Sequence, residues 1–243
     1  MKPNLLKKKL ADGVRCVGGW AAIPDPFACE VYAAQGWDSV TIDMQHGASN
    51  INDAVPLLTA IQSAGDATPL IRVPWNDPGQ IMRALDAGAM GIICPMINSK
   101  AEAVALVRSA KYPPMGGRSW GGYTALQAFG LSPAEYLKQA NSATLVFAMI
   151  ETQAALDAVE EIAAVPGLDG LFVGPSDLSI ALSNGAGIDR TGAPTLEAMK
   201  RIAAAAKKNG LVAGAFAGAA DIITTYGAMG YSFMAAAGDA DLL

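Results

Sequence analysis

The sequence predicts a single α/β domain, a (β/α)8 barrel that spans residues 1–243. A length of 243 residues is normal for one such barrel. Short apolar runs alternate with longer stretches of helical pattern along the whole chain. Several of these runs, such as GIICPMI and TLVFAMI, lack polar alternation, which is typical of strands buried on both faces in a parallel sheet.

Eight apolar runs are expected to be the strands, over residues 16–23, 39–45, 68–74, 91–97, 144–150, 169–174, 211–216 and 232–237. Many of the stretches between them begin at Asp, Ser, Thr or Asn and end at Gly, as helices do. This order favours a closed barrel over the alternative, an open doubly wound sheet. The dinucleotide-binding form of that sheet would carry G-x-G-x-x-G after its first strand, and the motif is absent. The chain stops soon after the eighth run, so the eighth helix is expected to be missing or to lie outside the given residues.

Composition and charge exclude several classes of protein. With 52% hydrophobic and 16% charged residues, the chain is not of the disordered type. A net charge of -5 argues against a nucleic-acid or anionic-membrane partner, which would need a basic face. No apolar stretch reaches the roughly 20 residues that span a bilayer, and we recognise no signal peptide. Cys16, Cys29 and Cys94 lack C-x-x-C spacing, and we interpret them as buried thiols of a cytoplasmic protein.

Two longer irregular stretches, 112–143 and 183–194, interrupt the alternation. Long loops in a compact domain are usually functional or mobile. The first stretch holds the glycine-rich segment MGGRSWGGY at 115–123, whose backbone could approach a ligand closely.

Polar and charged side chains follow four of the predicted strands, where a barrel of this kind builds its active site. They are Asp43, Gln45, His46, Arg72, Glu151, Ser176 and Asp177. Each alone has an ordinary structural interpretation, as a turn residue, a helix cap or a member of a buried ion pair. Together they place several titratable groups at one rim, which random surface charges would not do so consistently. We therefore expect an active site at this rim.

The residue types at the rim predict metal-assisted chemistry. Glu151 and Asp177 follow neighbouring strands and can both reach one ion, which suits Mg²⁺ or Mn²⁺ with water and substrate in the other positions. Arg72 offers a fork of donors for a carboxylate or an enolate oxygen. His46 can move a proton near neutral pH, and Asp43 can orient it. None of the ten lysines lies in a predicted strand, which argues against a Schiff-base mechanism.

Five segments in this order resemble the metal-dependent pyruvate aldolases of the HpcH/HpaI family: IDMQHG, IRVPWNDPGQIMRALDAGAMGIICPMI, YPPMGGRSWGG, MIET and GPSDLS. The resemblance covers nearly the whole chain. It implies a TIM barrel of the phosphoenolpyruvate/pyruvate type. It also implies that Glu151 and Asp177 hold Mg²⁺, Mn²⁺ or Co²⁺, that His46 is the base, and that Arg72 stabilises the transition state.

The resemblance extends to further positions. Asp86 matches an acid that supports the histidine as a base, and Ser176 matches a substrate contact. Gln45 and Met149 stand where the family often has Glu and Gln, beside the metal and the substrate. Together with Trp20 and Arg118, these residues complete the set that we expect to bind substrate.

The expected reaction is cleavage or formation of a 4-hydroxy-2-oxo acid, to or from pyruvate and an aldehyde, through a pyruvate enolate held by the metal and Arg72. Two other interpretations stay open. An acyl-CoA lyase of the citrate or malyl type would call for a longer chain and a basic nucleotide-facing patch. A non-catalytic barrel subunit would be favoured if no metal bound at Glu151 and Asp177.

Two further expectations concern selectivity and assembly. The segment 115–123, through Arg118, is expected to help choose the aldehyde while leaving pyruvate binding alone. A homo-oligomer is expected because a missing eighth helix would leave apolar barrel wall uncovered, and the resemblance implies a hexamer.

Overall fold

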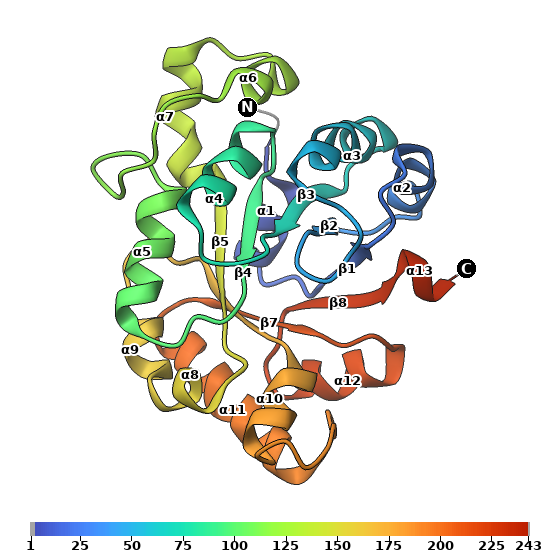
Figure 1. Cartoon of the computed structure of the whole chain (residues 1–243), viewed down its shortest axis with the longest axis vertical. Coiled ribbons are helices and arrows are strands. Elements are labelled where there is room, and N and C mark those ends of the chain that lie inside the picture. Colours follow the sequence, from blue (N-terminus) through green and yellow to red (C-terminus); the bar gives the residue numbers. More distant parts are fainter. Residues whose placement is uncertain (1–2, 243) are drawn as a thin grey trace.

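The structure, a computed structural model that describes residues 3–242, is a closed barrel of eight parallel strands in sequence order (Figure 1). The predicted fold class is confirmed. The strands are β1 (Cys16–Ala21), β2 (Ser39–Asp43), β3 (Thr68–Arg72), β4 (Gly91–Cys94), β5 (Leu145–Met149), β6 (Gly170–Val173), β7 (Val212–Phe216) and β8 (Phe233–Gly238). The first four strands end two or three residues earlier than predicted, because the residues that follow leave the sheet and form loops at the barrel mouth.

The helices surround this barrel. They are α1 (Leu5–Ala11), α2 (Pro26–Ala33), α3 (Ile51–Ala64), α4 (Pro78–Asp86), α5 (Lys100–Ala110), α6 (Tyr123–Phe129), α7 (Pro133–Ala143), α8 (Gln153–Asp157), α9 (Val159–Ala163), α10 (Pro175–Leu182), α11 (Ala193–Lys208), α12 (Ala220–Ala228) and α13 (Asp239–Leu242). Side-chain caps fix several N-termini, and the start of α3 carries a full capping box made by Asn50 and Asp53. None of the helices in the described residues is both long and apolar enough to cross a membrane.

Aromatic side chains fill the barrel interior below the mouth. Phe147, Phe172 and Phe233 are fully buried and contact one another, with ring centroids 5.4 to 6.4 Å apart. Gly214 leaves room for this cluster, because a Cβ there would lie 2.7 Å from the Phe172 ring. The barrel interior at this level is therefore a packed core, and a cavity at the carboxyl ends of the strands has these rings as its floor.

The stretch 112–143 is not the irregular loop that the sequence predicts, because it contains α6 and α7, which protrude from one side of the barrel (Figure 1). Its own small core consists of Tyr112, Ala125, Tyr136 and Ala140. Four residues at this core are too few to produce a clear periodic pattern in the sequence. The second irregular stretch is confirmed over 183–192, between α10 and α11.

In the described part of the chain, β8 is followed only by the four-residue α13, in agreement with the expected lack of a full eighth helix. The buried carboxylate of Asp239 accepts hydrogen bonds from the backbone N–H groups of Ala22 (2.8 Å) and Ile23 (3.2 Å). Ala22 in turn accepts a bond from the N–H of Ala48, at 3.0 Å. These bonds tie the end of the last strand to the loops that follow β1 and β2.

Candidate active site

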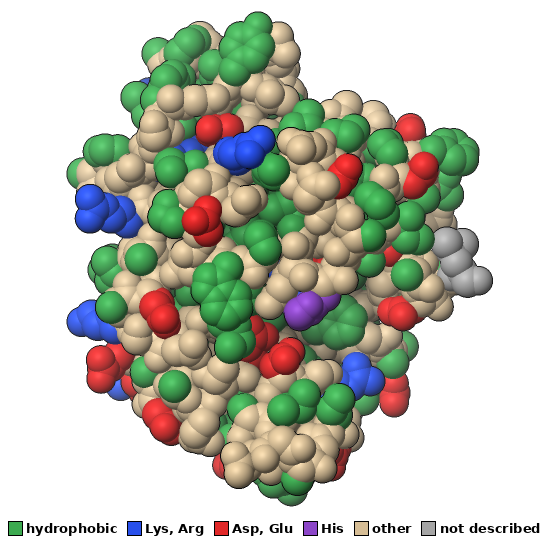
Figure 2. Space-filling model, viewed as in Figure 1, with side chains coloured by type: hydrophobic (Ala, Val, Ile, Leu, Met, Phe, Trp, Pro, Cys, Tyr) green, Lys and Arg blue, Asp and Glu red, His purple; other side chains and the backbone are tan. Residues whose placement is uncertain are grey.

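A cavity of about 300 Å³ opens at the carboxyl ends of the strands. Seven of its lining residues were expected from the sequence, and four more complete the wall: Trp20, Asp43, His46, Arg72, Met149, Ser176 and Asp177, then Phe172, Gly174, Pro175 and Phe216. Figure 2 shows this mouth, where the sole histidine of the chain lies next to acidic side chains. The expected rim is thus one continuous cavity above the aromatic core.

Asp43 and Arg72 form a bidentate ion pair in the cavity wall. They are register partners on β2 and β3, and Arg72 Nε and Nη2 donate to the two carboxylate oxygens at 2.8 and 2.6 Å. Trp20 Nε1 donates to the same carboxylate at 3.2 Å, and the guanidinium lies 5.0 Å from the Trp20 ring centre. Burial alone raises the pKa of Asp43, but the bonds and charge of Arg72 outweigh it and hold the pKa below its usual value. The pair fixes Arg72 as a cation at the cavity.

Asp43 contacts His46 through the backbone rather than through the ring. Its Oδ1 accepts from the N–H groups of Gln45 (3.0 Å) and His46 (3.3 Å), which shapes the turn after β2. Gly47 completes this turn, because a Cβ there would collide with the Asp43 carbonyl and lie 3.1 Å from the Ala22 Cα. Asp43 therefore places the exposed imidazole by fixing the turn that carries it.

Asp177 lines the cavity, whereas Glu151 does not and lies buried next to Gly174, which does. Glu151 is 3% exposed, and its Oε1 accepts a hydrogen bond from the N–H of Met96 at 2.8 Å. A Cβ on Gly174 would collide with Glu151 Oε2 and would lie 3.6 Å from Asp177 Oδ2, so both carboxylates face the space that this glycine leaves open. Asp177 lies in the first turn of α10, where the helix dipole favours a negative charge.

The electrostatics of this pair fit a divalent cation. Burial raises the pKa of Glu151 to about 7, and the charge of Asp177 adds to that rise, whereas the Met96 N–H and Arg72 act against it. Within residues 3–242 no group of three or more His, Cys, Asp or Glu side chains could hold a metal ion. The sequence predicts a set of only two protein ligands, both carboxylates, with substrate and water in the other coordination positions. Carboxylate oxygens of this kind suit Mg²⁺ or Mn²⁺.

Asp86 and Arg118, both expected to serve the site, pair with each other outside this cavity, and their roles stay predictions. Their side chains form an ion pair of 2.5 Å, and Arg118 is 4% exposed with its guanidinium 4.6 Å from the Tyr112 ring centre. Neither residue lines the cavity. Gln45 does not line it either, and its buried Oε1 has no hydrogen-bond partner among the described residues.

Five residues at the site were missed in the sequence: Phe172, Gly174, Pro175 and Phe216 in the cavity wall, and Met96 beside Glu151. Gly174 could have been found, since it directly precedes the helix that carries Ser176 and Asp177. Met96 gave no signal, because its role depends on a backbone conformation, φ 56°, that methionine rarely adopts. Phe216 stands at the end of an apolar run, a position that predicts an ordinary core residue.

Comparison with known proteins agrees with this arrangement. The sequence profile of the HpcH/HpaI aldolase/citrate lyase family matches residues 17–243. A hydroxypyruvate/pyruvate aldolase of Rhizorhabdus wittichii is 37% identical over 232 residues, which cover 96% of this chain and 91% of that protein. A 5-keto-4-deoxy-D-glucarate aldolase of Escherichia fergusonii is 34% identical over 238 residues, or 98% of this chain and 91% of that protein.

The fold gives the same result. A structure described as a member of this family, from Burkholderia cenocepacia J2315, matches with a TM-score of 0.90 at 35% identity. The match covers 98% of this chain and 94% of the other. The family profile spans almost the entire sequence, and the relatives named as aldolases are of nearly equal length. The chain therefore belongs to the HpcH/HpaI aldolase/citrate lyase family and is a carbon–carbon lyase.

Proposed function

We propose that this protein is a metal-dependent aldolase that cleaves or forms 4-hydroxy-2-oxo acids, with pyruvate as one product. The observation that carries the proposal is a pair of carboxylates, Glu151 and Asp177, which both approach Gly174 in the wall of the cavity that Arg72 lines. Relatives named for hydroxypyruvate/pyruvate and for 5-keto-4-deoxy-D-glucarate support this substrate class. A citrate lyase activity is the less supported alternative, because the relatives at 34% and 37% identity are both named aldolases.

Glu151 and Asp177 would hold the metal. Bound there, a Mg²⁺, Mn²⁺ or Co²⁺ ion would supply a Lewis acid for the oxygens of a 2-oxo acid. Glu151 offers Oε2 for this purpose, because Oε1 is already bonded to Met96. Asp177 is exposed at the cavity and comes from the first turn of α10, whereas Glu151 lies in the short connection between β5 and α8.

Side chains of the protein bind the substrate, transfer the proton and exclude water. Arg72 binds the carboxylate or 2-oxo oxygen of the substrate and stabilises negative charge that develops there. His46 takes the proton of the C4 hydroxyl, directly or through a water, while the C3–C4 bond breaks and the C4 carbon leaves as the aldehyde. The electron pair of the broken bond stays on the pyruvate half, whose C3 is then protonated. Trp20 and Phe216 form an apolar wall that limits water near this carbon.

The test compares Glu151→Gln and Asp177→Asn with wild type. Pyruvate release is measured over a panel of 4-hydroxy-2-oxo acids, after chelation and after addition of Mg²⁺, Mn²⁺ or Co²⁺. Each substitution should lower kcat/KM by the equivalent of several kcal/mol of transition-state stabilisation. Glu160→Gln, on the exposed surface, is the matched control and should behave like wild type. Full activity after exhaustive chelation, or an imine trapped by borohydride, would refute the proposal.

We also infer a cytoplasmic homo-oligomer, a hexamer by the family resemblance. The protruding segment supports association, because it exposes Met115 (50%), Trp120 (47%) and Tyr123 (72%) to solvent. Light scattering at micromolar concentration should show an assembly larger than one chain. A monomer with full activity would contradict this inference.

A further inference from the structure

The backbone at Met96, just after β4, has an unusual conformation. Its φ angle is 56°, in the left-handed region that residues other than Gly, Asn and Asp rarely adopt. Strained residues of this kind persist where the surroundings fix them, and they gather at functional sites. Met96 shares its unusual angle with only one other non-glycine residue in the described chain, Asn184.

The conformation of Met96 has a direct effect on Glu151. It aims the Met96 N–H at Glu151 Oε1, at 2.8 Å. The next residue, Ile97, returns to the sheet, since its N–H donates to the Met149 carbonyl at 3.3 Å. The unusual turn is thus confined to one residue, and its product is a single hydrogen bond to the buried carboxylate.

Asn98 holds this turn in place. Its Nδ2 donates to the Met96 carbonyl at 3.0 Å, and its Oδ1 accepts a hydrogen bond from the Thr152 hydroxyl. Its backbone N–H donates to the Glu102 carboxylate at 2.6 Å. One amide side chain therefore links Met96, which bonds Glu151, to Thr152, which directly follows Glu151 in the chain.

We propose that Asn98 is a positioning residue which, through the left-handed backbone of Met96, holds Glu151 in place for a divalent cation. The inference rests on the proposed function, because it takes Glu151 as a metal ligand. Asn98 does not line the cavity, so its effect has to pass through Met96 and Thr152. Without this support, a carboxylate beside Asp177 would lose its only hydrogen bond from the described residues and would be free to rotate away.

The experiment measures the affinity of the metal-free protein for Mn²⁺ by calorimetric titration of wild type and variants. Asn98→Ala should weaken Mn²⁺ binding about 10- to 100-fold, the range expected for residues that orient metal ligands. Asn141→Ala is the matched control. That amide also clamps a loop, with bonds of 2.7 and 2.9 Å to the backbone of Tyr112, but it lies away from the cavity. It should leave Mn²⁺ affinity within about twofold of wild type, since no metal ligand depends on it.

A pair of substitutions at Met96 tests the backbone directly. Met96→Gly keeps the N–H and adopts positive φ without strain, so it should retain the affinity. Met96→Val should weaken binding about as much as Asn98→Ala, because a branched side chain disfavours this conformation. This pair also covers the case in which Asn98→Ala fails to fold.

The possible outcomes separate the two proposals. If wild type binds no Mn²⁺, the proposed function fails and this inference fails with it. If wild type binds but Asn98→Ala matches Asn141→Ala, or Met96→Val matches Met96→Gly, the positioning role is overturned while the proposed function stands. Reduced affinity in Asn98→Ala and Met96→Val alone supports the role.

Discussion

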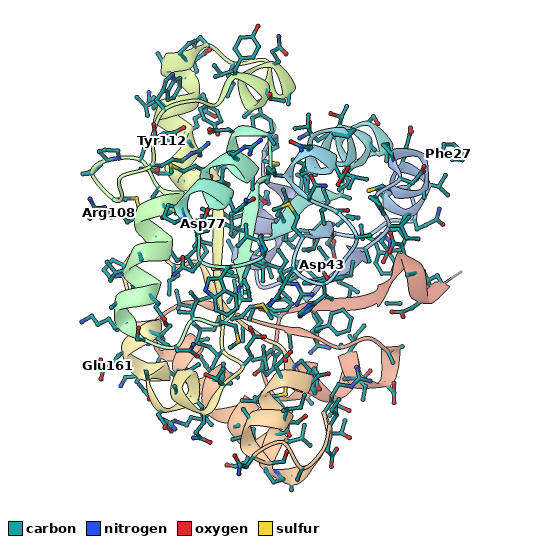
Figure 3. All side chains as sticks on the ribbon, in the orientation of Figure 1. Phe27, Asp43, Asp77, Arg108, Tyr112 and Glu161 are labelled. Atoms are coloured by element: carbon teal, nitrogen blue, oxygen red, sulfur yellow. The ribbon has the colours of Figure 1, made fainter. Side chains whose placement is uncertain are left out.

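Two aspartate–arginine pairs in this protein have nearly the same local chemistry. Arg72 binds Asp43 at 2.6 Å and Arg118 binds Asp86 at 2.5 Å. Each guanidinium also lies over an aromatic ring, with distances of 5.0 and 4.6 Å to the ring centre. In Figure 3, Asp43 lies near the middle of the molecule, whereas Tyr112, whose ring contacts the Arg118 guanidinium, lies toward the protruding α6 and α7.

The surroundings give the two pairs different roles. The Arg72 side chain is 11% exposed and lines the mouth cavity, while that of Arg118 is 1% exposed and sealed among tyrosines. Arg72 has a donor to offer a ligand, since its bonds to Asp43 use only Nε and Nη2. We therefore expect Arg72, at the end of β3, to bind substrate and Arg118, in a separate small core, to stabilise the fold.

The largest expected effect lies at the mouth. His46→Ala should slow exchange of the pyruvate methyl protons for deuterium about 10²- to 10⁴-fold, the usual contribution of a positioned base. Pyruvate binding should weaken far less, because in the proposed function it depends on Arg72 and the metal ligands. Proton NMR in D₂O follows the exchange. An unchanged rate would show that another group is the base.

Arg72→Ala should lower kcat/KM for aldol cleavage about 10²- to 10³-fold, as removal of one charge-stabilising donor does in other enzymes. Steady-state assays of pyruvate release measure it. Arg72→Lys should recover only part of the loss, since an ammonium group cannot bind Asp43 and a ligand with the same fork of donors. If Arg118→Ala lost as much kcat/KM as Arg72→Ala, the contrast between the two pairs would be wrong.

Arg118→Ala should instead act on stability. It removes a buried cation and leaves Asp86 unpaired, at a cost of about 2–4 kcal/mol in the free energy of unfolding. Denaturant unfolding measures this, and kcat/KM should stay within a few-fold of wild type. A change of about 10-fold or more in the preference between acidic and neutral aldehydes would restore the selectivity role that the sequence predicts for Arg118.

The smallest expected effect is a pH dependence of stability. Asp43 has a lowered pKa, so in wild type it contributes stability that is present above its unfolded pKa and lost as the pH falls through the folded value. In Arg72→Ala the bonds from Trp20 and Gln45 remain, but burial loses its largest counterweight, so the pKa of Asp43 should be higher than in wild type and its carboxylate should contribute less stability above about pH 4. The stability gap between wild type and this variant should therefore be widest at neutral pH and narrow toward about pH 4.

Urea unfolding at a series of pH values measures this gap. Arg118→Ala is the control, because it removes the arginine of the other pair and leaves Asp43 and Arg72 intact. If the difference in unfolding free energy between wild type and Arg72→Ala stayed constant with pH, the lost pairing of Asp43 would not be what destabilises this variant.

The sequence predicted the barrel and most of the mouth because both follow from regular patterns. Asp43, Arg72, Glu151 and Asp177 each come at or just after the end of a strand, and parallel strands bring those ends together. Arg118 could not be placed this way, because it lies in a long insertion whose path depends on contacts among a few aromatic rings.

The residues that hold Glu151 in place could not be identified from the sequence. Met96 and Asn98 look like ordinary loop residues, and the hydrogen bonds that link them to Glu151 depend on one backbone angle. Gln45, expected at the substrate, follows a strand just as His46 does. Its side chain nevertheless turns away from the cavity, and only the path of the turn after β2 decides between the two.

The packed rings of Phe147, Phe172 and Phe233 have a consequence for the order of product release. They close the barrel below the cavity, so substrate and products share one opening. If the pyruvate half lies beside Glu151 and Arg72, as we propose, the aldehyde lies nearer the exit and should leave first. Steady-state inhibition should then be ordered: pyruvate competes with the 4-hydroxy-2-oxo acid, whereas the aldehyde inhibits noncompetitively.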